Sequence, residues 1–338
     1  MNNTYNLTED LAKDLEQNTA PSLFQIKPAN EWLEEANKRP IPKMLFGEFW
    51  FESELCILFA DTNLGKSILA VQIANSISSG YPTCGLQLEA EQQPVIYLDF
   101  ELSDKQFECR YSENYKNHFN FNPNFFRAEI ETATKIPSTF ESFEAYLCES
   151  IKNTVLSRSA KVLIIDNISY LKNGTEKASE ATTLMIFLNE LKKAHNLSIL
   201  VLAHTPKRDY SKPLSKNDLS GSKSLMNFCD SSFAIGQSFN ATGVRYLKQI
   251  KQRVVEEIYG TENVITCSIV KDVNYLHFKF NDYDNELNHL KVSSINDTDT
   301  RNEEILSLKK EGHTNVAIAE MLKVSEGTVR NVLKKQNS

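Results

Sequence analysis

The stretch "LCILFADTNLGKSILAVQIANSIS", residues 55–78, joins an apolar run, a polar turn and a helical pattern. The turn ends in Gly65, Lys66 and Ser67, the second half of the phosphate-binding pattern G-x-x-x-x-G-K-[ST]. In such a loop, backbone N–H groups and the helix N-terminus surround phosphate, the lysine reaches the β- and γ-phosphates, and the hydroxyl holds Mg²⁺. The stretch therefore predicts a strand, a phosphate loop and a helix.

Ala60 stands where the first glycine of that pattern is expected. Alanine is tolerated there unless the position requires a positive φ, and Asp61 and Asn63 are residue types that accept unusual backbone angles. An ordinary strand-to-helix turn is the alternative interpretation. We expect ATP and Mg²⁺ as cofactors, bound by Ala60, Asp61, Thr62, Asn63, Leu64, Gly65, Lys66, Ser67 and Ile68.

Apolar runs of strand length alternate with amphipathic, helix-like segments through the middle of the chain. This alternation predicts an α/β fold with a mostly parallel sheet covered by helices on both faces. The predicted strands are 55–60, 94–100, 124–130, 161–167, 197–204, 231–237, 245–252 and 275–280.

Three of these runs end in side chains that suit phosphate chemistry: Glu101 after 94–100, Asp166 in "VLIID", and His204 in "ILVLAH". Carboxyl ends of parallel strands meet at one ligand crevice. Asp166 is expected to hold Mg²⁺ with Ser67, and Glu101 to orient or deprotonate the attacking water. His204 is expected to sense the γ-phosphate. Each residue taken alone also fits a solvated loop acid or a structural histidine.

Composition narrows the class of protein. The 338 residues carry 37 Lys and Arg against 44 Asp and Glu, a formal charge of −7, so any nucleic-acid contact requires a local basic patch. The six cysteines form no C-x-x-C pair, the first residues do not resemble a secretion signal, and the apolar runs are too short to span a membrane. We expect a cytoplasmic protein without a membrane partner.

The chain is predicted to have four parts: a polar helical segment over 1–40, an ATPase domain over 41–282, a polar linker over 283–300, and a helical domain over 301–338. In the last part Thr314 and Ser325 are expected to cap helices. Residues 301–336 carry seven basic and five acidic side chains, a local basic shift. A helical bundle that binds a protein partner is the alternative interpretation.

The ordered series "GKS … VIYLDFELSDKQFECR … KVLIIDNISYL … LVLAHTPKR … YLKQIKQR" resembles the RecA-fold ATPases of the DnaB/RadA/RepA group over roughly residues 40 to 280. It is most similar to plasmid RepA-type hexameric helicases. The tail, "IAEMLKVSEGTVRNVL", resembles a helix-turn-helix of the LuxR or resolvase type. The fold class expected is thus a RecA-like P-loop core plus a small all-α helix-turn-helix domain.

The resemblance implies roles for residues at matching positions. Lys66, Glu101, Asp166 and His204 would be catalytic, and Lys251 and Arg253 would act on a neighbouring subunit's nucleotide in a homo-oligomer, commonly a hexameric ring. A mobile loop over 211–225 would face the channel. The residues expected to contact DNA are Lys212, Lys216 and Lys223 for a single strand, and Thr328, Arg330, Asn331 and Lys334 for a duplex.

Two functions follow from these features. The first is an ATP-driven DNA motor, a RepA-like helicase or translocase that serves replication or mobilisation of a plasmid or mobile element. The second is an ATP-switched, site-specific DNA-binding regulator or loader without processive unwinding, which the tail and the altered phosphate loop favour. A KaiC-like signalling ATPase that does not bind DNA is disfavoured by the tail.

Overall fold

The computed structural model describes residues 24–131, 134–168, 178–219, 223–292, 295–322 and 324–335. The contacts divide the chain into two compact units, Met1–Pro42 and Lys43–Ser338. The described part of the first unit contains helix α2 (Ala29–Asn37), none of whose residues is buried. Beside it, Lys27 pairs with Glu35 and lies 5.1 Å from the ring centre of Trp32.

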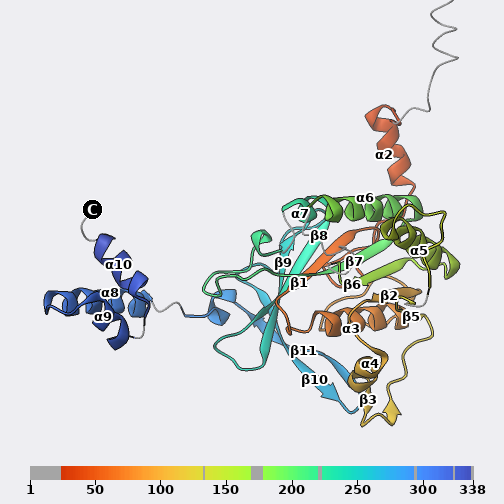
Figure 1. The fold of residues 1–338 in the computed structure, drawn as a ribbon. Coiled ribbons are helices and arrows are strands. Elements are labelled where there is room, and N and C mark those ends of the chain that lie inside the picture. The colour runs from red at the N-terminus through yellow and green to blue at the C-terminus, as the bar shows by residue number, and fades with distance from the viewer. Residues whose placement is uncertain are drawn as a thin grey trace, which may run out of the picture. The chain divides into compact units, whose positions relative to one another are not determined.

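Among the described residues of the second unit, nine strands form one sheet in the order β11-β10-β9-β8-β1-β7-β6-β2-β5 (Figure 1). The six strands from β8 to β5 run parallel, and β9, β10 and β11 are added antiparallel at one edge. The strands are β1 (Leu55–Ala60), β2 (Val95–Asp99), β5 (Phe125–Ala128), β6 (Val162–Asp166), β7 (Ser198–His204), β8 (Ser231–Gln237), β9 (Val244–Lys251), β10 (Val264–Asp272) and β11 (Tyr275–Asp284). A separate hairpin pairs β3 (Ser112–Glu113) with β4 (Asn117–His118).

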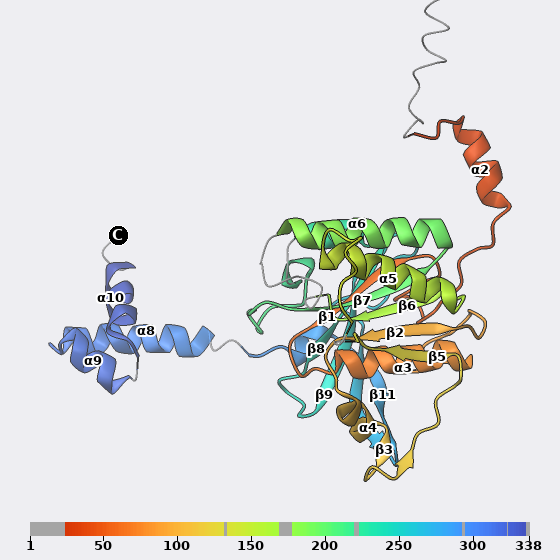
Figure 2. The ribbon, with the colours of Figure 1, turned by 45° about the vertical axis from the view of Figure 1, so that its right-hand side comes forward.

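Helices cover both faces of the parallel part. Helix α3 (Lys66–Ser79) lies on one face, and α5 (Phe143–Ser157) and α6 (Ala178–His195) lie on the other, as both views show (Figures 1 and 2). Side chains alternate between the faces along β1: Cys56 and Leu58 pack with α3, whereas Ile57 and Phe59 pack with α5 and α6. Every residue of β1 is buried because it is the central strand with helices on both sides. The sequence-based expectation of a mostly parallel, two-sided α/β sheet agrees with this architecture.

The antiparallel edge differs from the sequence-based expectation in two ways. Strand β10 was not predicted, because its polar and apolar residues do not form one continuous apolar run. Residues 283–291, expected to begin a linker, are attached to the ATPase domain: β11 continues to Asp284, and Glu286 and His289 of the 3₁₀ turn η2 (Glu286–His289) are buried. The polar side chains of this stretch favoured a linker in the sequence. Glu286 and His289 can nevertheless be buried because they have polar partners.

A buried ion pair explains how this turn attaches. Glu286 Oε2 lies 2.5 Å from Lys248 Nζ, and both side chains are at most 6% exposed. Glu286 Oε1 accepts hydrogen bonds from the backbone N–H of Leu214 (2.7 Å) and from the hydroxyl of Tyr246 (3.1 Å). Lys248 in turn donates to the Leu214 carbonyl (2.8 Å). The segment after β7 is therefore anchored at Leu214 to the antiparallel edge, and the part of the expected mobile loop around Leu214 is fixed.

The C-terminal helices form a small cluster of their own. Their bounds are α8 (Ile295–Lys310), α9 (Asn315–Met321) and α10 (Glu326–Lys335), so α8 begins inside the expected linker. Thr314 Oγ1 accepts from Ala317 N (3.2 Å) at the start of α9, which confirms the predicted cap. The buried centre of the cluster consists of Ile305, Ile318, Ala319 and Val329. Among the helices that the structure describes, none combines the length and apolar character needed to cross a bilayer.

Candidate active site

The carboxyl ends of four parallel strands meet beside the turn that follows β1. In the sheet register Asp166 of β6 lies opposite Asp99 of β2, and His204 of β7 lies opposite Ala60 of β1. Strands β6 and β7 are neighbours, so these ends form one continuous edge. The edge brings acidic and imidazole side chains to the phosphate loop.

A cavity of about 230 Å³ opens at this edge. Eight of its lining residues are ones that the sequence indicated, and Arg110 is the ninth. The cavity is lined by Thr62, Asn63, Gly65, Lys66, Ser67, Ile68, Glu101, Arg110 and His204. The structure thus places most of the expected nucleotide-binding residues and two expected catalytic side chains around one hollow.

The backbone of the loop explains why Ala60 is accommodated. Ala60 is the last residue of β1 and pairs with His204 on one side and Ile235 on the other, so its backbone is extended. The positive φ angles fall later in the turn, at Asn63 (65°) and Gly65 (95°). The loop therefore keeps its left-handed turn without a glycine at its first position.

Gly65 is required by space as well as by backbone angle. A Cβ atom at this position would lie 2.6 Å from Ile269 Cδ1 and 2.9 Å from Phe278 Cε2. These two side chains belong to β10 and β11, so the antiparallel edge supports the phosphate loop from the side. A side chain at residue 65 would displace either the loop or the edge strands.

Lys66 is held at the head of helix α3. Its Nζ donates to the Ala60 carbonyl (2.9 Å) and to the Asp61 carbonyl (3.1 Å), and the residue is 7% exposed. Burial lowers the pKa of its ammonium group. Nearby acids, of which Asp166 has the largest effect, raise this pKa and partly offset the effect of burial. A lysine has three N–H donors and the two carbonyls use two of them, so one is left for a ligand.

Asp166 is buried with an incomplete set of partners. The Tyr97 hydroxyl donates to its Oδ2 (2.6 Å), whereas its Oδ1 is buried and makes no hydrogen bond with the described residues. Burial raises the pKa of this carboxyl from the ordinary 3.8 to about 6, although the Ser67 and Tyr97 hydroxyls lower it. An orphaned carboxylate oxygen beside a serine hydroxyl fits a site for a hard divalent cation.

Glu101, Asn167 and His204 form a polar group at the same edge. The amide Nδ2 of Asn167 contacts Glu101 Oε1 and lies 2.9 Å from His204 Nε2, which is itself 3.4 Å from Glu101 Oε1. The contact with His204 lowers the pKa of Glu101, whereas partial burial raises it by a smaller amount. Glu101 is therefore ionised near neutral pH, as a proton acceptor must be. The sequence did not point to Asn167, and its only signal was its place directly after Asp166.

The loop that carries Glu101 is fixed by a buried carboxylate. Asp99 Oδ1 accepts from the backbone N–H groups of Glu101 (3.1 Å) and Leu102 (2.9 Å). Its Oδ2 accepts from Arg127 Nε (2.9 Å), and Arg127 Nη2 donates to the Leu102 carbonyl (2.7 Å). The position of Glu101 is thus set by β2 and β5 as well as by its own side-chain contacts.

Arg110 is a cavity residue that the sequence did not single out. It ends helix α4 (Asp104–Arg110), nine residues after Glu101, and its Nη1 is buried without a hydrogen-bond partner in the described residues. A guanidinium group with an unused donor at a cavity wall suits an anionic oxygen such as that of a phosphate. Arg110 and Lys66 each keep an unused N–H donor, and Asp166 Oδ1 is an unused acceptor. A nucleotide with a divalent metal would satisfy these groups.

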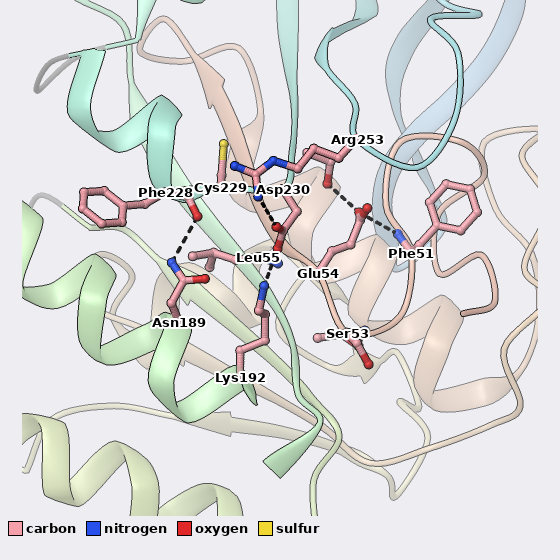
Figure 3. A network of polar contacts seen from close by, with 12 residues as sticks. Phe51, Ser53, Glu54, Leu55, Asn189, Lys192, Phe228, Cys229, Asp230 and Arg253 are labelled. Atoms are coloured by element: carbon pink, nitrogen blue, oxygen red, sulfur yellow. Dashed lines mark hydrogen bonds and ion pairs between the residues drawn. The ribbon is translucent and has the colours of Figure 1, made fainter. Parts of the chain in front are cut away.

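Lys251 and Arg253 lie at the amino ends of the parallel strands, the end of the sheet opposite the phosphate loop. Figure 3 shows Arg253 beside Asp230. Arg253 Nη1 is 3.0 Å from Asp230 Oδ1, and Lys251 Nζ donates to the carbonyls of Met226 and Cys229 (2.6 Å each). Asp230 also lies 2.5 Å from Lys192 Nζ. Since β1 separates the two edges, at about 3.3 Å per residue over its length, neither cation reaches this chain's own phosphate loop.

The residues expected to contact DNA occupy three separate places. Lys212 is exposed and lies 3.5 Å from Asp209, and Lys216 begins the 3₁₀ turn η1 (Lys216–Asp218). Lys223 starts helix α7 (Lys223–Phe228), and its side chain is outside the described part. On α10, Arg330, Asn331 and Lys334 are exposed and Thr328 is partly buried, with Arg330 paired to Glu326 (2.7 Å).

We predict that Asp166→Asn stabilises the nucleotide-free protein at high pH. The folded-state pKa of about 6 lies above the ordinary 3.8, so protonation favours the folded state. That contribution is fully present below about pH 4 and is lost as the pH rises through about 6. The variant should exceed the wild type by up to about 3 kcal/mol at pH 8 and by little near pH 4.

Urea unfolding of both proteins at the two pH values measures this difference. The wild type at each pH is the matched control, because all other titrating groups are shared. An equal difference at both pH values would mean that the Asp166 carboxylate carries no burial cost.

Comparison with known families agrees with this site. The family model described as an AAA domain matches residues 20–209, which is 190 of the 338 residues and includes the phosphate loop, Glu101, Asp166 and His204. No curated protein matches the chain. AAA domains are P-loop ATPases that bind nucleotide with a divalent metal and often form oligomers. The chain belongs to the AAA domain family.

Proposed function

We propose that this chain is an ATP-hydrolysing DNA-binding protein, and specifically a RepA-like DNA motor that unwinds or translocates along DNA. The observation that carries the ATPase part is the cavity in which Lys66, Ser67, Glu101 and His204 surround one hollow beside Asp166. These side chains, which come from strand ends, the loop after β2 and the start of α3, are of the types that phosphoryl transfer to water uses.

The residues divide the chemistry among them. Lys66, Arg110 and the N–H groups at the start of α3 bind the phosphates. Ser67 and Asp166 would hold Mg²⁺, which when bound offsets phosphate charge. Glu101 accepts a proton from the attacking water as the bond from water oxygen to the γ-phosphorus forms and the bond to ADP breaks. The side-chain amide of Asn167 keeps Glu101 beside His204.

A DNA motor is supported by the segment that follows His204. This segment begins at the cavity and carries Lys212 and Lys216, eight and twelve residues after His204. Cations able to contact a DNA backbone therefore lie on the segment that leaves the proposed γ-phosphate site. Lys223 follows at the start of α7. In the proposed motor, these cations would move with each hydrolysis cycle on either side of the anchored Leu214 and so drive a single strand.

A homo-oligomer is supported by the placement of Lys251 and Arg253. They lie at the edge of the sheet opposite the phosphate loop and are held there by Asp230 and by backbone carbonyls. In the proposed oligomer, cations in this position would serve the nucleotide of another copy. A closed ring, as in a hexamer, places every site between two subunits.

An ATP-switched, site-specific DNA binder is the second candidate. It is favoured by the C-terminal cluster, in which Arg330, Asn331 and Lys334 are exposed on α10 while Val329 fills the core. A helix that presents polar and basic side chains opposite its buried face suits the major groove of a duplex. In this case hydrolysis resets the protein rather than moving it.

We predict that the purified protein hydrolyses ATP and that Lys66→Ala abolishes nucleotide binding, because the variant lacks the buried ammonium group that offsets phosphate charge. Steady-state hydrolysis would be measured alone, with single-stranded DNA and with duplex. Strong stimulation by single strands supports the motor. Slow hydrolysis that ignores single strands, together with ATP-dependent duplex binding, supports the switched binder. Unchanged nucleotide affinity in a folded Lys66→Ala protein contradicts the site.

Arg253→Ala should leave ATP affinity intact and lower turnover at least about tenfold, as expected for a cation that contacts a neighbour's nucleotide only in the transition state. Arg158→Ala, which also removes an exposed arginine, is the matched control. Turnover of the wild type should rise with protein concentration until assembly is complete. Normal turnover of Arg253→Ala would refute a role for this arginine in trans.

For the tail, Arg330→Gln with Lys334→Gln should weaken duplex binding and reduce the slope of log affinity against log salt by about 2, because two phosphate contacts are lost. Lys309→Gln with Lys310→Gln removes the same charge from α8 and is the control. Fluorescence anisotropy with labelled duplex at several salt concentrations gives both slopes. Equal slopes would show that α10 docks a protein instead.

A further inference from the structure

The phosphate loop is bound from the side by the segment that follows β7. Asp61, the first residue after β1, accepts a hydrogen bond from the hydroxyl of Thr205 at its Oδ1. Its Oδ2 lies 3.5 Å from Nε of Arg208. The backbone carbonyl of the same Asp61 accepts from Lys66 Nζ (3.1 Å). Asp61 therefore joins the lysine of the phosphate loop to two side chains of another segment.

Arg208 is buried to an extent that requires a partner. Its side chain is 3% exposed, and its Nε makes no hydrogen bond with the described residues. The guanidinium lies 4.9 Å from the ring centre of Tyr210, and Nη1 donates to the Lys212 carbonyl (3.2 Å). Asp61 is the carboxylate that it faces across 3.5 Å, which is longer than the roughly 2.9 Å of a formed N–H···O bond. A shift of the phosphate loop by less than about 1 Å would close this contact.

The contact continues into the core. The Arg208 guanidinium lies next to the Tyr246 hydroxyl, which donates to Glu286 (3.1 Å), and Glu286 is paired with Lys248. Glu286 and Lys248 also bind the backbone of Leu214. Two acids and two bases thus alternate from the phosphate loop to the segment 205–219. Charges arranged in this way compensate one another only while all of them stay in place.

We propose that Thr205 and Arg208 are positioning residues for the phosphate loop, which they hold through Asp61, and that the contact between Arg208 and Asp61 tightens when nucleotide binds. The proposal rests on the proposed ATPase site for its second half only. Neither side chain lines the cavity, so both act through Asp61. Because coupling is reciprocal, whatever binds the segment 205–219 changes the affinity of the loop for nucleotide by the same factor.

Hydrogen exchange without nucleotide tests the first half. Arg208→Gln removes the charge and keeps most of the length, and the adjacent, exposed Lys207→Gln is the matched control. We expect backbone N–H groups of residues 61–66 to exchange about tenfold faster in Arg208→Gln than in the control. Equal exchange in the two variants would overturn the proposal. If Arg208→Gln does not fold, Asp61→Asn breaks the same contact from the more exposed side, and faster exchange is then expected at residues 205–210.

Nucleotide supplies the second readout. In the wild type, ADP should slow exchange over 205–214, and Arg208→Gln should lose this protection and bind ADP about tenfold more weakly, compared at a temperature at which both proteins are fully folded. The double variant with Asp61→Asn should bind no more weakly than either single variant, because both remove one contact. Additive losses, or protection that persists in Arg208→Gln, would overturn the coupling. A wild type that binds no nucleotide refutes the proposed function instead, while the exchange test at 61–66 still decides the positioning role.

Discussion

The burial of charged groups at the carboxyl edge of the parallel sheet is the constraint on which the rest of this structure depends. An ion removed from water costs several kcal/mol unless its environment replaces the lost hydration. Lys66 obtains that replacement from two carbonyls of its own loop, and Asp166 from the Tyr97 hydroxyl. Among the buried groups that have no hydrogen-bond partner in the described residues, three lie at this site: Asp166 Oδ1, Arg110 Nη1 and His204 Nδ1. Unsatisfied buried groups that gather beside a cavity are the signature of a binding site rather than of a defect.

The antiparallel edge is needed to shape that site. Ile269 and Phe278 pack on Gly65, and Tyr246, Lys248 and Glu286 anchor the segment that leaves His204. The antiparallel strands come late in the chain. They therefore support the phosphate loop at Gly65 and also anchor the segment after His204. A family pattern centred on the loop does not include these strands, since the matched range ends at residue 209.

The sequence predicted those features of the fold that a single segment determines, and it missed those that depend on partners far away in the chain. The strand, turn and helix around Lys66 were predictable, because a continuous apolar run and a helical pattern each reflect burial of that segment alone. The site residues Glu101, Asp166 and His204, at or just after the ends of β2, β6 and β7, were predictable from the order of parallel strands. Strand β10 and the turn at Glu286 were not, since their polar side chains are buried by partners far away in sequence. Asn167 and Arg110 were not predicted for the same reason. Their roles depend on contacts, of Asn167 with Glu101 and of Arg110 with the cavity, that the local sequence does not show.

The carboxyl and amino ends of the parallel strands differ in how their charged side chains are partnered. At the carboxyl edge, Asp166 Oδ1, Arg110 Nη1 and His204 Nδ1 have no hydrogen-bond partner among the described residues. At the amino edge, Arg253 is about half exposed, yet Asp230 and the Asn227 carbonyl already hold its guanidinium group. Lys192 shares Asp230 from the buried side, so the acid keeps a partner even when Arg253 turns outward. In the proposed oligomer, Arg253 could therefore leave Asp230 for a phosphate bound by another copy without leaving that acid unpaired.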